Sequence, residues 1–332
     1  MNKTSGGTAG NPGGLTMERI SSARKLLQSV GVASRMILGR SFPSNGAAEV
    51  HLKLESEGPT GSFKWRGAYC AVWKRMQGGG KIPGVVTSST GNHGAATAWA
   101  ARKMGIAARV YLPEKPNPSK RLRIAQEGAE IVEVGSCLEE SREHAERFAR
   151  ERGWYNLVDG VEPEMLPGTA AIGAEALEQV SLAEGDAIFV PVGDSTLIRG
   201  VAWAVKRMRP GVRVIGVQAE RAPAYALGLR AGKAMRTETS ETMADGLAVR
   251  VATEENVREM AGLVDEFVLV SEEEMLGAVR QLVMEEQVVA EPAGAAASAA
   301  YGKTAESYRG KKVVLLVTGA NIAEELLTKA MG

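Results

Sequence analysis

Short apolar segments alternate with longer amphipathic segments along most of the chain, and this alternation limits the folds that the sequence can adopt. A typical pair is the apolar run 84–87 followed by the alanine-rich segment 92–104, which has the length and spacing of a helix. Strands that alternate with helices form βαβ units, in which helices cover a parallel sheet. We therefore expect an α/β protein with at least one open parallel sheet.

The predicted strands are residues 49–55, 84–87, 109–112, 131–134, 187–192, 213–217, 267–270 and 312–317. The predicted helices are residues 15–32, 65–76, 92–104, 119–127, 138–152, 169–182, 197–208, 222–231, 253–263, 271–286, 291–301 and 322–331. Residues 1–14 are rich in Gly, Ser, Thr and Asn, so we expect a disordered N-terminus. In open parallel sheets, ligands bind where strands end and helices begin.

The composition excludes several classes of protein. Lys and Arg number 40 against 39 Asp and Glu, so charge gives no reason to expect a nucleic-acid or membrane partner. Two cysteines and the lack of a secretory signal pattern predict a cytoplasmic protein with reduced thiols. Three scattered histidines make no zinc pattern, and we predict no metal site. A length of 332 residues allows one large or two moderate domains.

Residues 61–68 (GSFKWRGA) place Lys64 at the start of a predicted helix. Apolar walls from Phe63 and Trp65, with the like charge of Arg66, would lower the pKa of the amine and make it able to form an imine with an aldehyde. The alternative is an exposed lysine at a helix start.

Residues 88–94 (SSTGNHG) follow one predicted strand and begin a helix. Backbone amides and hydroxyls at such a turn suit a carboxylate. The alternative is a capping turn, for which Ser, Thr and Asn are the usual residues. The turns 193–196 (GDST) and 316–321 (LVTGAN) are similar in position, and ordinary helix capping explains them equally well.

The lysine motif and the SSTGNHG turn resemble those of the pyridoxal-phosphate (PLP) enzymes related to serine and threonine dehydratases, in particular catabolic threonine dehydratases and serine racemases. The resemblance implies a fold-type II (tryptophan synthase β-like) enzyme with two open-sheet domains and PLP in the cleft between them. It implies a large domain of residues 15–46 and 153–332, a small mobile domain of residues 47–152, and a homodimer.

The resemblance also implies roles for individual residues. Lys64 and Thr90 are the expected catalytic residues. The expected substrate-binding residues are Ser89, Thr90, Gly91, Asn92, His93 and Arg142. The expected cofactor-binding residues are Phe63, Lys64, Asn92, Gly193, Asp194, Ser195, Thr196, Leu197, Glu291 and Thr318.

This sequence departs from the family pattern at several of these positions. The family's run of four glycines around the phosphate is reduced here to Gly193, and Asp194 would have to point away from a phosphate dianion. Gln218 stands where relatives of serine racemase have a metal-binding glutamate, which is a second reason to predict no metal. Thr90 replaces the serine that serves racemisation.

The hypothesis that follows is a PLP-dependent ammonia-lyase. It would eliminate the hydroxyl from a 3-hydroxy amino acid such as L-threonine or L-serine, giving a 2-oxo acid and ammonia. One alternative is a racemase, or a dehydratase of a bulkier or acidic 3-hydroxy amino acid such as phenylserine or 3-hydroxyaspartate. Another is a non-catalytic relative that binds an amino acid without turnover.

Overall fold

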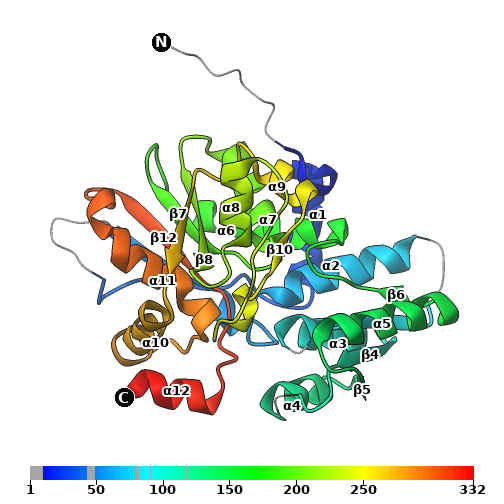
Figure 1. Cartoon of the computed structure of the whole chain (residues 1–332). Helices are drawn as coiled ribbons and strands as arrows, with labels where there is room; N and C mark the ends of the chain where they lie inside the picture. Colours follow the sequence, from blue (N-terminus) through cyan, green and yellow to red (C-terminus); the bar gives the residue numbers. More distant parts are fainter. Residues whose placement is uncertain (1–9, 43–48, 79–81, 90, 117) are drawn as a thin grey trace.

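A computed structural model describes residues 10–42, 49–78, 82–89, 91–116 and 118–332 (Figure 1). The chain is an α/β protein, as the alternating pattern predicts, and it has two separate open sheets, as the family resemblance implies. The expected disorder of residues 1–14 is wrong for residues 12–14, where the short helix η1 (Pro12–Gly14) lies, and residues 1–9 lie outside the described residues. Pro12 is buried, and the Gly13 amide donates to Oε1 of Glu259 over 3.1 Å.

The large sheet has six strands in the order β1-β2-β12-β7-β8-β11. All its neighbouring strands are parallel except β1 and β2, which are antiparallel. Its strands are β1 (Met36–Leu38), β2 (Glu49–Leu54), β7 (Ala187–Pro191), β8 (Arg213–Ala219), β11 (Glu266–Val270) and β12 (Lys312–Val317). Along β12, Val313 and Leu315 pack into one apolar core while Val314 and Leu316 pack into another. Both faces of this sheet are therefore covered, which explains the uninterrupted apolar runs of β7 and β12.

The small sheet has four parallel strands in the order β5-β4-β3-β6. Its strands are β3 (Gly84–Ser88), β4 (Ala107–Leu112), β5 (Glu130–Glu133) and β6 (Tyr155–Asn156). A further two-stranded antiparallel ribbon joins β9 (Met235–Arg236) to β10 (Val251–Ala252), and neither strand is among those predicted from the sequence.

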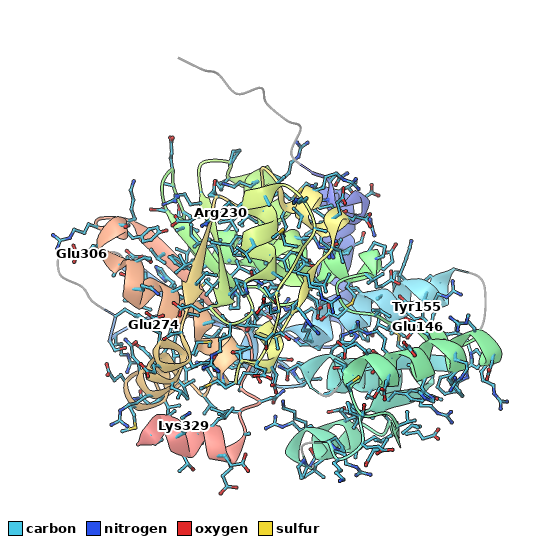
Figure 2. All side chains as sticks on the ribbon, viewed as in Figure 1. Glu146, Tyr155, Arg230, Glu274, Glu306 and Lys329 are labelled. Atoms are coloured by element: carbon cyan, nitrogen blue, oxygen red, sulfur yellow. The ribbon has the colours of Figure 1, made fainter. Side chains whose placement is uncertain are left out.

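The helices are α1 (Met17–Gln28), α2 (Lys64–Gln77), α3 (Asn92–Met104), α4 (Pro118–Gln126), α5 (Leu138–Arg152), α6 (Leu166–Gln179), α7 (Thr196–Met208), α8 (Ala224–Ala231), α9 (Glu254–Met260), α10 (Glu272–Glu286), α11 (Pro292–Thr304) and α12 (Glu324–Met331). Figure 1 shows α3, α4 and α5 around the small sheet at the lower right, with α6, α7 and α8 beside the large sheet. Exposed charged side chains such as Glu306 and Lys329 lie at the edge of the molecule in this view (Figure 2). Among the described residues, no helix combines the length and the apolar character that crossing a membrane requires.

Two strands lie on the other side of the domain boundaries that the sequence suggested. β2, which was expected in the small domain, pairs with β12 in the large sheet, and Leu52 and Leu54 are fully buried there. β6, which was expected in the large domain, pairs with β3 in the small sheet. Both are short segments whose partners lie far away in the sequence, so local periodicity could not assign them to a sheet.

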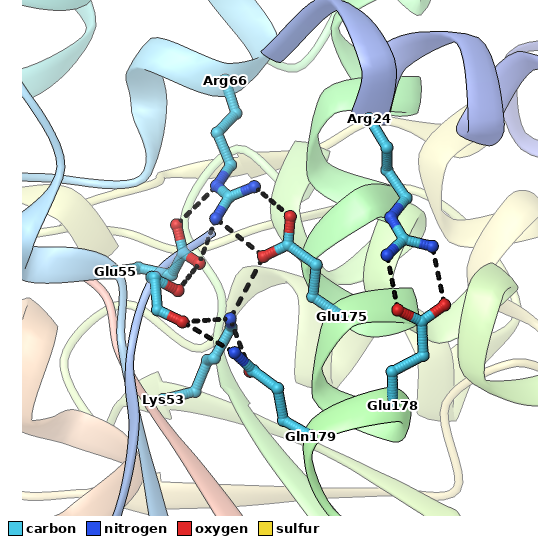
Figure 3. Close-up of polar contacts among 8 residues, drawn as sticks. Arg24, Lys53, Glu55, Arg66, Glu175, Glu178 and Gln179 are labelled. Atoms are coloured by element: carbon cyan, nitrogen blue, oxygen red, sulfur yellow. Dashed lines mark hydrogen bonds and ion pairs between the residues drawn. The ribbon is translucent and has the colours of Figure 1, made fainter. Parts of the chain in front are cut away.

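Arg66 of the lysine motif belongs to a buried ionic network (Figure 3). Arg66 donates to Glu55 over 2.8 and 3.0 Å and to Glu175 over 2.8 and 2.9 Å. Lys53 donates to Glu175 over 3.1 Å and to Gln179 over 2.8 Å. Lys53 alternates along β2 with the apolar residues Leu52 and Leu54, but its side chain is fully buried like theirs. The network makes that burial tolerable because each charge has an opposite partner.

Candidate active site

A cavity of about 300 Å³ lies between the turns of the two sheets. The α3 side contributes Ser89, Gly91, Asn92 and His93, while the start of α7 contributes Asp194. Strand ends and helix starts from both sheets therefore meet at one place, as expected for ligand sites in open parallel sheets. Three further residues of the predicted site line the cavity, namely Lys64, Arg142 and Glu291. Asp159, Asp245 and Asn321, which were not predicted as site residues, line it as well.

Lys64 is the first residue of α2, and its side chain is only 13% exposed. The segment before it is fixed to the end of β12, because the Phe63 amide donates to the Thr318 carbonyl over 3.0 Å and Ser62 bridges to Gly319. The Nζ atom lies 5.0 Å from the centroid of the Phe63 ring and forms an ion pair with Asp159. The amine thus points into the cavity and not into bulk water.

The expected depression of the Lys64 pKa is wrong for the protein alone. Burial lowers this pKa, but the carboxylates of Asp159 and Asp194 more than offset it, and the net shift is upward. Arg66, which was expected to repel the ammonium, is occupied by Glu55 and Glu175 in the buried network. Lys64 is consequently held as a charged, oriented ammonium group.

Asp159 is a site residue that sequence reasoning missed. It follows β6, which is only two residues long and carries no periodic signal. Its side chain is 7% exposed, and its Oδ1 accepts a hydrogen bond from the Thr196 hydroxyl over 2.7 Å. Burial raises the pKa of this carboxyl, but the Lys64 ammonium and the hydrogen bonds from Lys64 and Thr196 bring it below the ordinary value. Asp159 is therefore an ionised carboxylate inside the cavity.

The turn before α3 presents backbone amides without a side-chain cap. Gly91 is the N-cap residue and no side chain of the described residues caps the helix, so the capping alternative receives no support from them. The Gly91 amide donates to the Ser89 hydroxyl over 3.4 Å, and Gly91 has open space where a side chain would be. Thr90 lies outside the described residues.

Asn92 and His93 have different environments at the start of α3. Asn92 donates to Oε1 of Glu291 over 2.6 Å and accepts from Asn321 over 2.6 Å. The His93 ring is buried, with Nε2 lying 3.0 Å from the Leu157 carbonyl, and burial lowers its pKa. His93 is thus a neutral imidazole whose Nδ1 has no hydrogen-bond partner among the described residues.

Arg142, on α5, lines the edge of the same cavity. Its side chain is exposed, and among the described residues it forms no ion pair. Two further cationic residues from α4 also line the cavity: Lys120 forms an ion pair with Asp245, and Arg123 donates to Asn321. Asn321 is the last residue of the 316–321 turn, so its position in the sequence could have suggested it.

The turn before α7 has the properties of an anion-binding site. Ser195 has a left-handed φ of 70°, and its buried hydroxyl oxygen lacks a partner among the described residues. A Cβ at Gly193 would lie 2.1 Å from the Gly246 carbonyl oxygen, so only glycine fits there. The Thr196 hydroxyl already binds the Asp159 carboxylate, which shows that an anionic group fits beside this helix start.

Two residues of this turn differ from expectation. Asp194 does not point away from the cavity but lines it, and burial followed by repulsion from Asp159 raises its pKa to about 6. The Leu197 side chain is buried in an apolar core of the large sheet, so only its backbone remains for a ligand.

Glu291 and Thr318 lie on two connected segments, the start of α11 and the end of β12. Glu291 lines the cavity and burial raises its pKa, while its backbone amide donates to the Gly319 carbonyl over 2.9 Å. Thr318 is buried, and its hydroxyl donates over 3.5 Å to the Ala293 carbonyl. The side chain of Gln218 donates to the Val192 carbonyl over 3.4 Å and accepts from the Ala226 amide over 2.8 Å. The described residues contain no group of three or more metal-ligating side chains.

The sequence matches the profile of the family described as pyridoxal-phosphate dependent enzyme over residues 38–319. The chain belongs to this family. Membership implies pyridoxal phosphate as the cofactor, and the two open sheets match the fold-type II structures of such enzymes.

Individual relatives belong to the threonine dehydratase branch. The chain is 35% identical over 315 residues to an L-threonine ammonia-lyase of Thermotoga maritima, covering 95% of this chain and 78% of the relative. It is 34% identical over 276 residues to a catabolic L-threonine dehydratase of Staphylococcus aureus, covering 82% and 79%.

Solved structures show the same relationship. The processed form of threonine deaminase isoform 2 from Solanum lycopersicum has a TM-score of 0.85 at 26% identity, covering 99% of this chain and 93% of that one. Maize serine racemase has a TM-score of 0.85 at 27% identity, covering 95% and 96%. The family resemblance and the fold class predicted from the motifs are thus confirmed.

The residues in and beside the cavity fit the cofactor that the family implies. An amine able to hold an aldehyde lines the cavity at Lys64. Ser195, the neighbour of the lining residue Asp194, has a buried hydroxyl with no partner among the described residues. The ion pair between Lys64 and Asp159 shows that the cavity accepts an anion close to this amine.

Proposed function

We propose that the protein is a PLP-dependent ammonia-lyase that acts on a 3-hydroxy amino acid such as L-threonine or L-serine. The products would be a 2-oxo acid and ammonia. The relatives described above support this proposal, since they are an L-threonine ammonia-lyase and a catabolic threonine dehydratase. The observation that carries it is the Lys64 amine, which lies in a cavity between the uncapped start of α3 and the start of α7.

Each part of the cofactor has a candidate partner in this chain. Pyridoxal phosphate supplies an aldehyde and a ring that stabilises negative charge at the substrate Cα. Lys64 would hold the aldehyde, and the Ser195 hydroxyl with the backbone amides of Ser195 and Thr196 would hold the phosphate at the start of α7. Thr318 and Glu291 would lie near the ring, where a neutral hydroxyl favours elimination over reactions that need a long-lived carbanion.

The remaining residues bind the substrate and move its proton. The backbone amides at the start of α3 would bind the substrate carboxylate, because they carry no side-chain cap. Lys64, once its amine is free, would accept the Cα proton at Nζ. Asn92 would be held for cofactor contact by its hydrogen bonds to Glu291 and Asn321.

The test is the Lys64→Ala variant, purified in the presence of added PLP. We expect loss of the absorption of lysine-bound cofactor and loss of ammonia release from L-threonine and L-serine. Lys329→Ala, an exposed lysine on α12, is the matched control and should retain both (Figure 2). Full turnover by Lys64→Ala would refute the proposal.

A second candidate function is elimination from an acidic 3-hydroxy amino acid. Arg142 favours it, because it lines the cavity and has no ion pair among the described residues. An assay panel of both enantiomers of threonine, serine, phenylserine and 3-hydroxyaspartate separates the candidates. Preferred turnover of 3-hydroxyaspartate would support this second function, and interconversion of enantiomers would indicate a racemase. We also propose a homodimer, which sedimentation of the purified protein would test.

A further inference from the structure

The carboxylate of Asp159 connects the Lys64 amine to the start of α7. One oxygen, Oδ1, accepts hydrogen bonds from the Thr196 hydroxyl over 2.7 Å and from the Gly160 amide over 2.9 Å. The other oxygen, Oδ2, forms the ion pair with Lys64 Nζ. The carboxylate is therefore anchored on one side and presented to the amine on the other.

No other cation of the described residues competes for this carboxylate. Arg199, on the first turns of α7, donates to Glu259 over 2.6 Å and to the Gly160 carbonyl over 2.9 Å. His93 is neutral and directs Nε2 to the Leu157 carbonyl. Asp159 therefore pairs with Lys64. Because its side chain is almost buried and is bound at both oxygens, its carboxylate has one orientation.

We propose that Asp159 is a positioning residue for Lys64, whose carboxylate fixes the amine at a set place relative to the phosphate-binding start of α7. The inference rests on the proposed function, because that function makes Lys64 the aldehyde-binding residue. The aldehyde and the phosphate of the cofactor are attached to one rigid ring. The Lys64 amine and the phosphate-binding start of α7 must therefore lie at a fixed distance and orientation from each other. Asp159 provides the physical link between them through Thr196.

The same contact controls the charge of the amine. Three carboxylates face Lys64, namely Asp159, Asp194 and Glu291, and only Asp159 both contacts the ammonium and accepts its hydrogen bond. Asp159 in turn is faced by Lys64, His93 and Asp194. Replacing Asp159 by Asn keeps the shape and removes the charge, so Lys64 should lose its proton at lower pH.

The first measurement follows the charge of Lys64 without any cofactor. Protein freed of PLP is modified with an amine-reactive anhydride at a series of pH values, and the modification of Lys64 is measured by mass spectrometry. For Asp159→Asn we expect the midpoint of modification about one pH unit or more below that of the wild type. Asp194→Asn is the matched control, with a smaller shift. Superposition of the Asp159→Asn and wild-type profiles, or an equal shift in the control, would overturn the proposal.

The second measurement tests the position of the Lys64 amine with a probe that has no phosphate group. Pyridoxal, which lacks phosphate, is offered to Lys64, and the product is fixed with borohydride and located by mass spectrometry. In Thr196→Val the ion pair remains but its anchor is lost, so we expect several-fold slower capture with little change in the modification midpoint. Capture at the wild-type rate would contradict the positioning role, even if Asp159→Asn fails to fold. If wild-type Lys64 captures neither pyridoxal nor PLP, the proposed function fails, and the anhydride profile still decides the role of Asp159.

Discussion

The side-chain amide of Asn92 donates to Oε1 of Glu291 over 2.6 Å, and this hydrogen bond joins the small sheet to the large one. Asn321 completes the connection by donating to Asn92 Oδ1 over 2.6 Å. Asn92 is therefore held from both sides by residues that follow strands or loops of the large sheet. The cavity depends on this junction, because its two walls come from different sheets.

The first prediction concerns this junction. Asn92→Ala removes a hydrogen bond to a carboxyl group, an interaction that contributes about 1.5–3 kcal/mol when one partner is charged. We expect kcat/KM for ammonia release to fall by about 10-fold or more. Glu291→Gln is the control, since it keeps an oxygen acceptor for Asn92 and should lose less. Equal losses in the two variants would show that the charge of Glu291, and not the hydrogen bond, is what the site needs.

The second prediction concerns the buried ionic network (Figure 3). Glu175→Ala leaves Arg66 and Lys53 with one carboxylate fewer in a buried site, and breaking such a network costs about 3–5 kcal/mol. Urea unfolding should show this loss in the free energy of unfolding. Glu178→Ala, on the same helix, breaks an ion pair with Arg24 that is partly exposed and should cost less than about 1 kcal/mol. Similar losses of unfolding free energy in both variants would contradict the conclusion that the buried network contributes more to stability than the exposed ion pair.

The third prediction concerns the turn before α7. A Cβ at Gly193 would lie 2.1 Å from the Gly246 carbonyl oxygen, so Gly193→Ala forces two backbone segments apart. We expect a loss of about 1–3 kcal/mol in the free energy of unfolding, with weaker PLP binding. Gly277→Ala, in α10, meets no atom within 4 Å and should instead stabilise the protein by about 0.5–1 kcal/mol. An unchanged stability of Gly193→Ala would show that this contact relaxes freely.

The fourth prediction concerns pH. Burial first, and Asp159 second, raise the pKa of Asp194 from its ordinary value of 3.8 to about 6 in the folded protein. A raised carboxyl pKa disfavours the ionised form, so this group's contribution to stability falls as the pH rises from about 3.8 to about 6 and stays low above that.

Asp194→Asn carries no charge and should escape this penalty. In the protein without cofactor, the variant should match the wild type near pH 4 and be more stable by on the order of 2 kcal/mol at pH 8. Thermal unfolding across this pH range measures the difference. Glu306→Gln, an exposed residue paired with Arg309, is the control (Figure 2). A stability gain in Asp194→Asn that does not change with pH would point to packing in place of charge.

The sequence alone determined the order and type of most elements. The helices predicted at 92–104 and 138–152 have those same bounds in α3 and α5, because long periodic segments carry their signal locally. The motif around Lys64 and the turn at Asn92 also identified the family. The reaction requires particular residue types in a short stretch, and these can be recognised in the sequence without knowledge of the fold. Both residues lie in the cavity.

Only the tertiary structure decided which distant segments meet. β2 pairs with β12, and Asp159 reaches Lys64, through contacts between residues far apart in the chain. The expected repulsion from Arg66 was wrong for the same reason, because Glu175, in another helix, neutralises it. A periodic pattern reports the neighbours of a residue along one helix or strand. The charge state of a buried amine depends instead on which carboxylates the fold brings to it.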